Sequence, residues 1–198
     1  PLQRLSIVGC AGMGALSYVP EMLQGEPKSL PKMDELQQMA LDLFDEKVDV
    51  DEELLYRSSG NSGGCRPKCL LQDEEGSWIV KFRHTYDPMD MGRMEWRYND
   101  VARRCGIDVP DFKLIDDCYF ATKRFDVVDG VRYHVITAAA MLGVSHQVPT
   151  LDYSVLLNLT GWLTQNPKEV EQMFRRMVFN VLAKNRDDHA KNFSFIYT

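Results

Sequence analysis

The sequence predicts an α+β fold in which a sheet-containing part precedes a helical part. Two short apolar runs, residues 68–72 and 78–82, are joined by a polar, glycine-containing turn, which is typical of an antiparallel hairpin. Later in the chain, residues 152–164 are predicted to be one helix, and the segment that begins at residue 166 is predicted to be another, with an apolar face. These observations favour an antiparallel sheet followed by packed helices.

The composition is that of a globular protein. Of the 198 residues, 44% are hydrophobic, which is enough apolar material for one compact core or two small lobes. The formal net charge of -6 disfavours a general attraction to nucleic acid or to an anionic membrane. No apolar run approaches the roughly 18 residues of a membrane span, and the chain start lacks a secretory signal pattern. We therefore expect a cytoplasmic protein with no membrane contact and no direct nucleic-acid partner.

The cysteines and the chain ends support two further expectations. The five cysteines form no CxxC pair and have no histidines at zinc spacing, so we expect reduced thiols rather than disulfides or a zinc site. The chain begins at Pro1 without a methionine and stops at Thr198, directly after a predicted strand at residues 193–197. We therefore expect a fragment of a longer protein.

Four elements are predicted before the hairpin. Residues 12–19 predict a turn that enters a short strand, and residues 20–31, with three prolines, predict a loop. From Met33 onward, apolar residues recur at helical spacing and predict an amphipathic helix of about three turns. A loop of small residues at 58–64 (SSGNSGG) then leads into the hairpin.

The elements after the hairpin begin with a helix at residues 91–105, followed by Gly106, a residue type that often ends helices. Three further strands are predicted at residues 112–115, 118–125 and 132–136. The last helix is well marked, because Asn166 is a preferred N-cap, Pro167 a preferred first helical residue, and Glu169 completes the capping pattern. Its apolar face predicts a buried core helix and consists of Val170, Met173, Phe174, Met177, Val178 and Val181.

That helix leads directly into residues 185–192 (NRDDHAKN), which contain a spacing used in phosphoryl transfer. Arg186 and Asp187 followed by Asn192 reproduce the Arg-Asp-x4-Asn spacing of protein kinases, with Asn185 where histidine is usual. Asp187 is a candidate acceptor of a hydroxyl proton, and Asn192 offers a neutral oxygen to Mg²⁺, a cation that prefers oxygen ligands. Taken alone, the segment also fits an Asp- and Asn-rich turn after a helix.

Upstream residues fit the same chemistry. Lys81 ends an apolar run, where a partly desolvated ammonium needs a phosphate or a carboxylate, and Glu95 in the next helix is the candidate carboxylate. Lysine is also common as the solvent-facing residue of an edge strand, and Glu95 also fits a solvated helix face. The glycine-rich loop offers backbone N–H groups and hydroxyls to phosphates at Ser62, Gly63 and Gly64, although it is not a Walker A sequence and such turns are common.

The order of these parts along the chain favours a kinase over an unrelated set of turns and strands. A glycine-rich loop, a strand lysine, a helical glutamate, a sheet, a capped helix and an Asp-x4-Asn loop follow one another in the order of kinases. The sequence resembles the HipA family, kinases of bacterial toxin–antitoxin modules, over nearly its whole length. The blocks that resemble the family are residues 12–16 (GMGAL), 62–68 (SGGCRPK), 123–126 (KRFD) and 179–195 (FNVLAKNRDDHAKNFSF).

The resemblance implies a two-lobed, protein-kinase-like HipA fold. Residues 1–125 would form the N-terminal lobe with its antiparallel sheet, and residues 126–198 would begin the helical C-terminal lobe. ATP and Mg²⁺ would be the cofactors, and a protein serine or threonine would accept the phosphoryl group. An aminoacyl-tRNA synthetase is the kind of protein substrate that the family implies, and a DNA-binding antitoxin protein is the implied partner.

The resemblance also implies roles for individual residues. Asp187 would be the catalytic base with His189 and Asn192 beside it, and Asn192 would also be a metal ligand. Lys81 would hold the nucleotide phosphates, and residues 123–126 would lie at the hinge against adenine and ribose. The expected cofactor-binding residues are Ser62, Gly63, Gly64, Lys81, Glu95, Lys123, Phe125 and Asp126.

Two departures from the family pattern matter. HipA-type kinases use a further metal-binding aspartate after the catalytic loop, and this chain stops soon after Asn192. We therefore expect kinase activity in the full-length protein and an inactive fragment. The serine that the family autophosphorylates aligns with Asn61, and the sequence does not decide between the nearby Ser59 and Ser62.

Two other function classes stay open. One is a nucleotide-binding or antitoxin-docking domain without turnover. The other is a small-molecule kinase, because positioning of the phosphates dominates the recognisable residues whatever the acceptor is.

Overall fold

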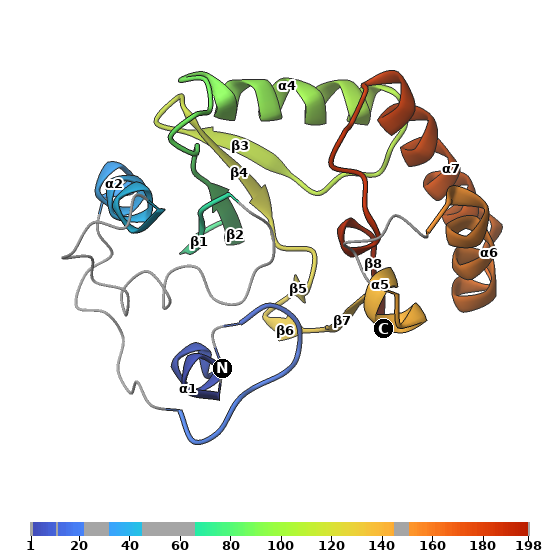
Figure 1. Ribbon diagram of the computed structural model, residues 1–198, viewed down its shortest axis with the longest axis horizontal. Coiled ribbons are helices and arrows are strands. Elements are labelled where there is room, and N and C mark those ends of the chain that lie inside the picture. The colour runs from blue at the N-terminus through green and yellow to red at the C-terminus, as the bar shows by residue number, and fades with distance from the viewer. Residues whose placement is uncertain (1, 11, 22–31, 45–65, 145–150, 198) are drawn as a thin grey trace. The chain divides into compact units, whose positions relative to one another are not determined.

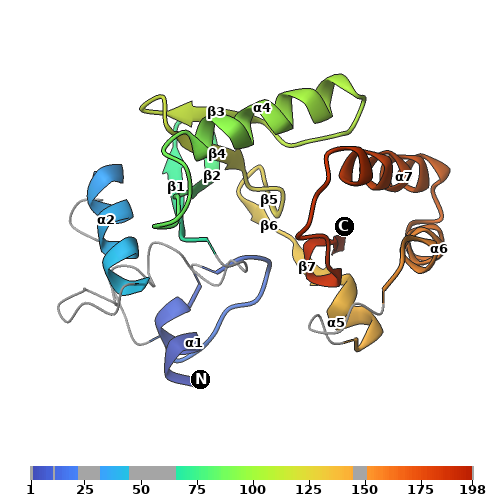
Figure 2. The ribbon, with the colours of Figure 1, turned by 45° about the horizontal axis from the view of Figure 1, so that its top comes forward.

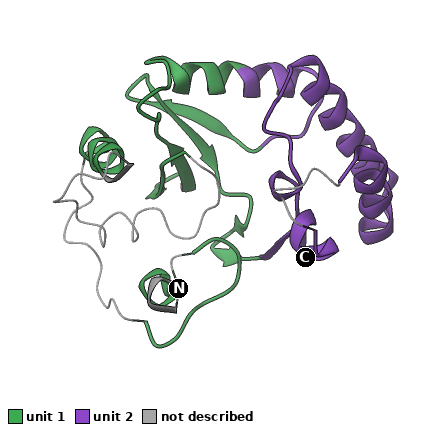
Figure 3. Ribbon diagram, viewed as in Figure 1, with its two compact units in different colours: residues 1–97, 110–133 green, residues 98–109, 134–198 purple. Residues whose placement is uncertain are grey.

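The computed structural model describes residues 2–10, 12–21, 32–44, 66–144 and 151–197. It divides into two compact units, Pro1–Arg97 with Pro110–Tyr133 and Tyr98–Val109 with His134–Thr198 (Figure 3). The sequence placed the boundary after residue 125. That boundary stays a prediction. Within the second unit, the Asp108 N–H donates to Gln172 Oε1 (2.9 Å).

The first unit is built on a four-stranded antiparallel sheet (Figure 1). Its strands are β1 (Lys68–Asp73), β2 (Gly76–Lys81), β3 (Phe112–Ile115) and β4 (Tyr119–Lys123), in the order β1-β2-β4-β3. The predicted hairpin is confirmed: β1 and β2 pair from Lys68 opposite Lys81 to Asp73 opposite Gly76. The predicted strand at 112–115 is confirmed at both ends, and β4 is shorter than the predicted 118–125.

The core of this unit follows from strand periodicity, since alternate residues point to opposite faces of a sheet. Trp78, Val80 and Phe82 are buried together on one face with Tyr119 and Ala121. The predicted helix from Met33 is confirmed as α2 (Met33–Phe44), whose Leu36 joins the same cluster (Figure 2). The opposite face carries Phe120, which packs beside Phe112, and Trp96 of α4 (Met91–Arg104) meets the Phe112 ring edge-on.

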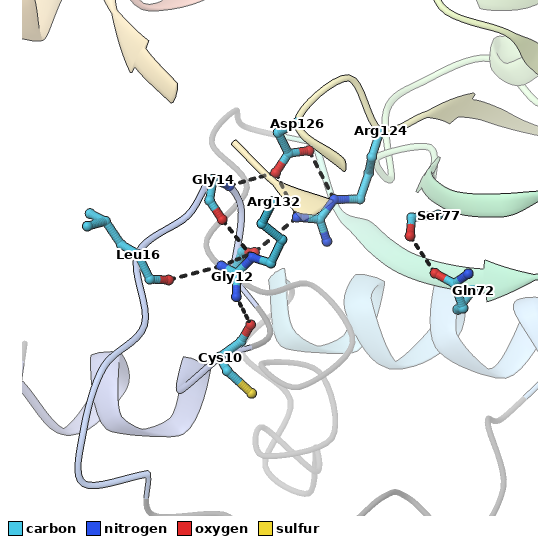
Figure 4. A network of polar contacts seen from close by, with 9 residues as sticks. All are labelled: Cys10, Gly12, Gly14, Leu16, Gln72, Ser77, Arg124, Asp126 and Arg132. Atoms are coloured by element: carbon cyan, nitrogen blue, oxygen red, sulfur yellow. Dashed lines mark hydrogen bonds and ion pairs between the residues drawn. The ribbon is translucent and has the colours of Figure 1, made fainter. Parts of the chain in front are cut away.

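A short helix, α1 (Leu2–Val8), begins the chain. The segment that follows it contacts a pair of short strands, β5 (Val127–Val128) and β6 (Val131–Arg132), through Arg132. The strand predicted within residues 12–19 does not form. Instead, the Arg132 guanidinium donates to the carbonyls of Gly12 (3.1 Å), Gly14 (2.7 Å) and Leu16 (2.9 Å), and also to that of Cys10 (Figure 4). One side chain thus pairs the carbonyls that a neighbouring strand would have paired.

A buried ion pair lies beside this contact. Asp126 has no exposed surface, and its carboxylate accepts from Arg124 at 2.7 and 3.0 Å and from the Gly14 N–H at 2.6 Å (Figure 4). Burial alone would raise the pKa of Asp126, but the bonds from Arg124 and Gly14 outweigh it and hold the pKa below its ordinary value. The carboxylate of Asp126 therefore joins the ion pair to Gly14, which is distant in sequence.

The second unit is mostly helical. It contains β7 (His134–Thr137), α5 (Ala138–Leu142), α6 (Tyr153–Thr164), α7 (Pro167–Leu182), the short 3-10 helix η1 (Ala190–Asn192) and β8 (Ser194–Tyr197). The predicted strand at 132–136 is divided, because Arg132 belongs to β6 whereas β7 pairs with β8. The predicted N-cap at Asn166 is confirmed, because Asn166 Oδ1 accepts from Lys168 N. At the start of α6, Asp152 Oδ1 accepts from Val155 N.

Helix α7 is less buried than its sequence predicts. Met173 is 6% exposed and packs with Leu156 and Leu159 of α6, but Phe174 is 49% exposed and Val181 is 67% exposed. The expectation of a buried core helix is therefore wrong for most of the apolar face. Within the described part of this unit, α7 contacts α6 and also bonds residues 105–108 through Gln172, Arg175 and Arg176. An amphipathic pattern does not reveal how much of a face is covered.

Two kinds of feature are absent from the described residues. No helix in these ranges is long and apolar enough to cross a membrane. In the same ranges, His, Cys, Asp and Glu side chains do not gather in a group that would bind a metal. Cys10, Cys69, Cys105 and Cys118 are free thiols, and Cys65 lies outside the described residues.

Replacing Asp126 with asparagine should lower the free energy of unfolding by about 3–5 kcal/mol, because Arg124 would keep a buried charge without its partner. Urea denaturation measures this change, with Glu74→Gln on the exposed β1–β2 turn as the control. Since the pKa of Asp126 is depressed, its contribution is present above about pH 3.9 and is lost as the pH falls further. A D126N protein as stable as wild type at pH 7 would contradict the assignment.

Candidate active site

The structure places the predicted site residues in two groups. Lys81, Glu95 and residues 123–126 belong to the first unit, and Asp187, His189 and Asn192 belong to the second. Ser59, Asn61, Ser62, Gly63 and Gly64 lie outside the described residues, so their predicted roles stay predictions. Each group is therefore described within its own unit.

The predicted pairing of Lys81 with Glu95 is present. Lys81 is the last residue of β2 and points to the α4 side of the sheet, where its Nζ lies 2.7 Å from Glu95 Oε2 and 5.4 Å from the centre of the Phe120 ring. Both side chains are partly buried, at 36% exposure for Lys81 and 16% for Glu95. The glutamate thus fixes an ammonium group that would otherwise be costly to desolvate.

A second cation shares this carboxylate. Arg66 Nη1 lies 3.9 Å from Glu95 Oε1, and the same guanidinium holds Asp87 through bonds of 2.8 and 3.0 Å. The hydrogen bond from Arg66 holds the pKa of Asp87 below its ordinary value, against the opposing effect of burial. A cavity of about 210 Å³ opens beside the pair and is lined by Lys81, Glu95 and Phe120, among others. Of these two cations, Lys81 lines the cavity.

Glu95 reaches Lys81 because α4 approaches the sheet unusually closely. A Cβ on Gly92 would lie 1.8 Å from the Cys118 carbonyl oxygen in the β3–β4 turn, a distance that no side chain permits. Arg93 fixes the same turn, since its Nε donates to the Asp117 carbonyl at 2.7 Å. Gly92 therefore lets the helix backbone touch the turn one helical turn before Glu95.

The predicted hinge residues have different environments. Phe125 is 40% exposed and Lys123 is partly buried, and the Lys123 N–H donates to the Asp111 carbonyl (2.7 Å). Asp126 is fully buried, and both carboxylate oxygens already bond to Arg124. The carboxylate of Asp126 thus has a structural partner in this conformation, and its contact with a nucleotide stays a prediction.

In the second unit, residues 185–192 form a loop in which the side-chain amides of Asn185 and Asn192 bond the backbone of Asp187. The Asp187 N–H donates to Asn185 Oδ1 at 3.1 Å, and Asn192 Nδ2 donates to the Asp187 carbonyl. The Asp187 side chain is 86% exposed, with His189 Nε2 at 3.3 Å from its Oδ1. The backbone of Asp187 is therefore held on both sides while its carboxylate is open to reactants. The Asn192 amide turns its nitrogen to the loop, which leaves its oxygen for a hard cation.

The neighbouring aspartate has the opposite environment. Asp188 is partly buried, and its Oδ2 accepts from the Tyr153 hydroxyl at 2.5 Å. Burial and this bond raise the pKa of Tyr153 to about 12, so the phenol stays a donor at neutral pH. Sequence reasoning gave no role to Tyr153 or to its other partner, Asn180, although Asn180 lies within the family-like block at residues 179–195. The one hint in the sequence was that Asp187 and Asp188 are adjacent, which suggests that one of the two carboxylates has a hydrogen-bond partner elsewhere in the fold.

Comparison with known proteins decides the family. A family model described as the HipA-like C-terminal domain matches residues 60–198, which is more than half of the chain. The chain belongs to this HipA-like family. The match includes Lys81, Glu95 and the whole of residues 185–192, so the HipA-like domain contains both groups of candidate residues.

Relatives of the HipA-like chain point the same way. It is 30% identical over 139 residues to a protein of Sinorhizobium fredii named "Putative kinase Y4dM", covering 62% of this chain and 34% of that relative. It superposes with a TM-score of 0.65 and 20% identity on a chain from a Shewanella oneidensis complex of HipA, HipB and operator DNA. That match covers 98% of this chain and 53% of the solved one, and it shows the HipA kinase-like fold. The HipA-like chain thus spans about a third to a half of these proteins.

Replacing Gly92 with alanine should displace α4 from the β3–β4 turn and lower the free energy of unfolding by about 1–3 kcal/mol, as overpacking does elsewhere. Urea denaturation measures the change. The matched control is Gly161→Ala in α6, where the added Cβ would lie 3.5 Å from a Val170 methyl carbon. Because alanine favours helix over glycine, Gly161→Ala should be neutral or stabilising. Equal effects of the two substitutions would refute the close approach.

Proposed function

We propose that this chain supplies the nucleotide-holding pair and the catalytic loop of an ATP-dependent protein kinase of the HipA type. The ion pair between Lys81 Nζ and Glu95 Oε2, at 2.7 Å, is the observation that supports the proposal most directly. A lysine on a strand held by a glutamate on the following helix is the arrangement that protein kinases use to hold nucleotide phosphates. Membership of the HipA-like family supports the same activity.

The second unit supplies the groups for transfer. Mg²⁺ bound with ATP would neutralise charge on the phosphates, and the Asn192 amide oxygen is the group in this chain suited to the metal. Asp187, open to solvent and fixed through its backbone, would accept the proton of a serine or threonine hydroxyl. Phosphoryl transfer depends mainly on such positioning, so a small set of well-held groups is sufficient.

The partners follow from the same family membership. The solved neighbour is part of a complex with HipB and operator DNA, in a toxin–antitoxin system. For this protein we propose an antitoxin protein as the partner and a protein, such as an aminoacyl-tRNA synthetase, as the substrate. The net charge of -6 favours a protein partner over direct contact between this chain and DNA.

Replacing Asp187 with asparagine in the full-length protein should lower kcat by about 10²- to 10⁴-fold, the usual contribution of a general base. Incorporation of radiolabelled phosphate from ATP measures the loss. The control is Asp129→Asn, which removes an exposed carboxylate from the β5–β6 turn and places asparagine where the φ is +51°. Equal incorporation by wild type and D187N would exclude the proposed base.

Replacing Lys81 with methionine should raise the KM for ATP by about tenfold or more, because a charged hydrogen-bond donor to the phosphates is lost. Lys168→Met, on the exposed first turn of α7, is the matched control and should leave the KM unchanged. Tight ATP binding by wild type without any transfer would instead favour a binding domain. Transfer to small alcohols but not to proteins would favour a small-molecule kinase.

A further inference from the structure

One tyrosine hydroxyl connects three segments of the second unit. Tyr153, the first residue of α6, donates from its hydroxyl to Asp188 Oδ2 (2.5 Å) and accepts from Asn180 Nδ2 of α7 (2.9 Å). Its ring meets Phe193 edge-on, with centroids 5.7 Å apart and an interplanar angle of 81°. The start of α6 is thus tied to the last turns of α7 and to both sides of η1.

The same network reaches Asp187 from its N-terminal side. Asn180 Oδ1 accepts from Asn185 Nδ2 at 3.3 Å, and the Asn180 carbonyl accepts from the Asn185 N–H at 2.9 Å. Asn185 Oδ1 in turn accepts from the Asp187 N–H at 3.1 Å. A chain of four hydrogen bonds therefore leads from the backbone of Asp187 to Asp188, through Asn185, Asn180 and the Tyr153 hydroxyl.

The Asp188 carboxylate makes this hydroxyl hard to replace. Its Oδ1 is buried without a hydrogen-bond partner among the described residues, so the bond from Tyr153 to Oδ2 stabilises the charge almost alone. A carboxylate that loses its hydrogen-bond donor in a partly buried place moves toward water or toward another donor. Either change would shift the backbone between Asp187 and His189, where the proposed base is attached.

We propose that Tyr153 is a positioning residue that fixes residues 185–192 through Asp188 and Asn180, so that Asp187 is presented in one orientation. The inference rests on the proposed function, because it gives Asp187 the role of base. It also divides the two adjacent aspartates: the exposed Asp187 meets the acceptor, and Asp188 anchors the loop. As a positioning residue, Tyr153 acts on Asp187 through the loop.

Replacing Tyr153 with phenylalanine in the full-length protein tests the proposal, because the ring and its contact with Phe193 are kept and only the hydroxyl is lost. We expect kcat to fall by about tenfold to a hundredfold, the equivalent of one hydrogen bond to a charged group, with the KM for ATP unchanged. Tyr197→Phe on β8 is the matched control, since Tyr197 is 79% exposed. Equal loss in both variants, or a loss confined to the KM for ATP, would overturn the assignment.

Asp188→Asn provides the second arm. The neutral amide does not carry a buried charge, so Y153F combined with D188N should be no slower than Y153F alone and should recover part of the lost kcat. Independent, multiplying losses would show that Tyr153 and Asp188 do not act through one another.

Amide hydrogen exchange separates this proposal from the proposed function, since it needs no activity. Exchange in residues 183–193 should be faster in Y153F than in wild type, and unchanged in Y197F. If wild type transfers no phosphate but Y153F still loosens the loop, the kinase proposal fails and the positioning role stands. If exchange in the loop is the same in all three proteins, the positioning role is wrong.

Discussion

The close contact between α4 and the β3–β4 turn is the constraint on which the first unit's site depends. Glu95 can pair with Lys81 only if the helix backbone comes near enough to touch the Cys118 carbonyl, and only glycine at position 92 leaves that space. Arg93 then holds the turn from the exposed side of the helix. The ion pair is therefore a result of backbone packing, which brings the carboxylate of Glu95 to Lys81.

In the second unit, hydrogen bonds hold the loop of residues 185–192, while the Asp187 side chain is exposed to solvent. The backbone of Asp187 bonds to Asn185 and Asn192, and its carboxylate is exposed with His189 Nε2 3.3 Å away. Asp188 is turned inward to the Tyr153 hydroxyl. Two neighbouring residues of identical chemistry thus have opposite environments, because one is exposed and the other is partly buried.

Sequence patterns predicted most of the elements that hold the site. The β1–β2 hairpin, α4, α6 and α7 were all expected from periodicity and caps, and Glu95 was expected to pair with Lys81. The strand expected at residues 12–19 failed because Arg132, more than a hundred residues away, bonds the carbonyls that a strand would have used. Burial of α7 was overestimated at Phe174 and Val181, since periodicity shows which face is apolar but not what covers it.

Local spacing and short motifs lie in neighbouring residues, so they were enough to predict the order of the parts, the residue types of the chemistry and the resemblance to the HipA family. Three contacts appear only in the folded chain: Gly92 admits the β3–β4 turn, Asp126 bonds the Gly14 N–H, and Tyr153 holds Asp188. These contacts join segments far apart in the chain. Their energies depend on burial and on distances of a few tenths of an ångström, which no linear pattern encodes.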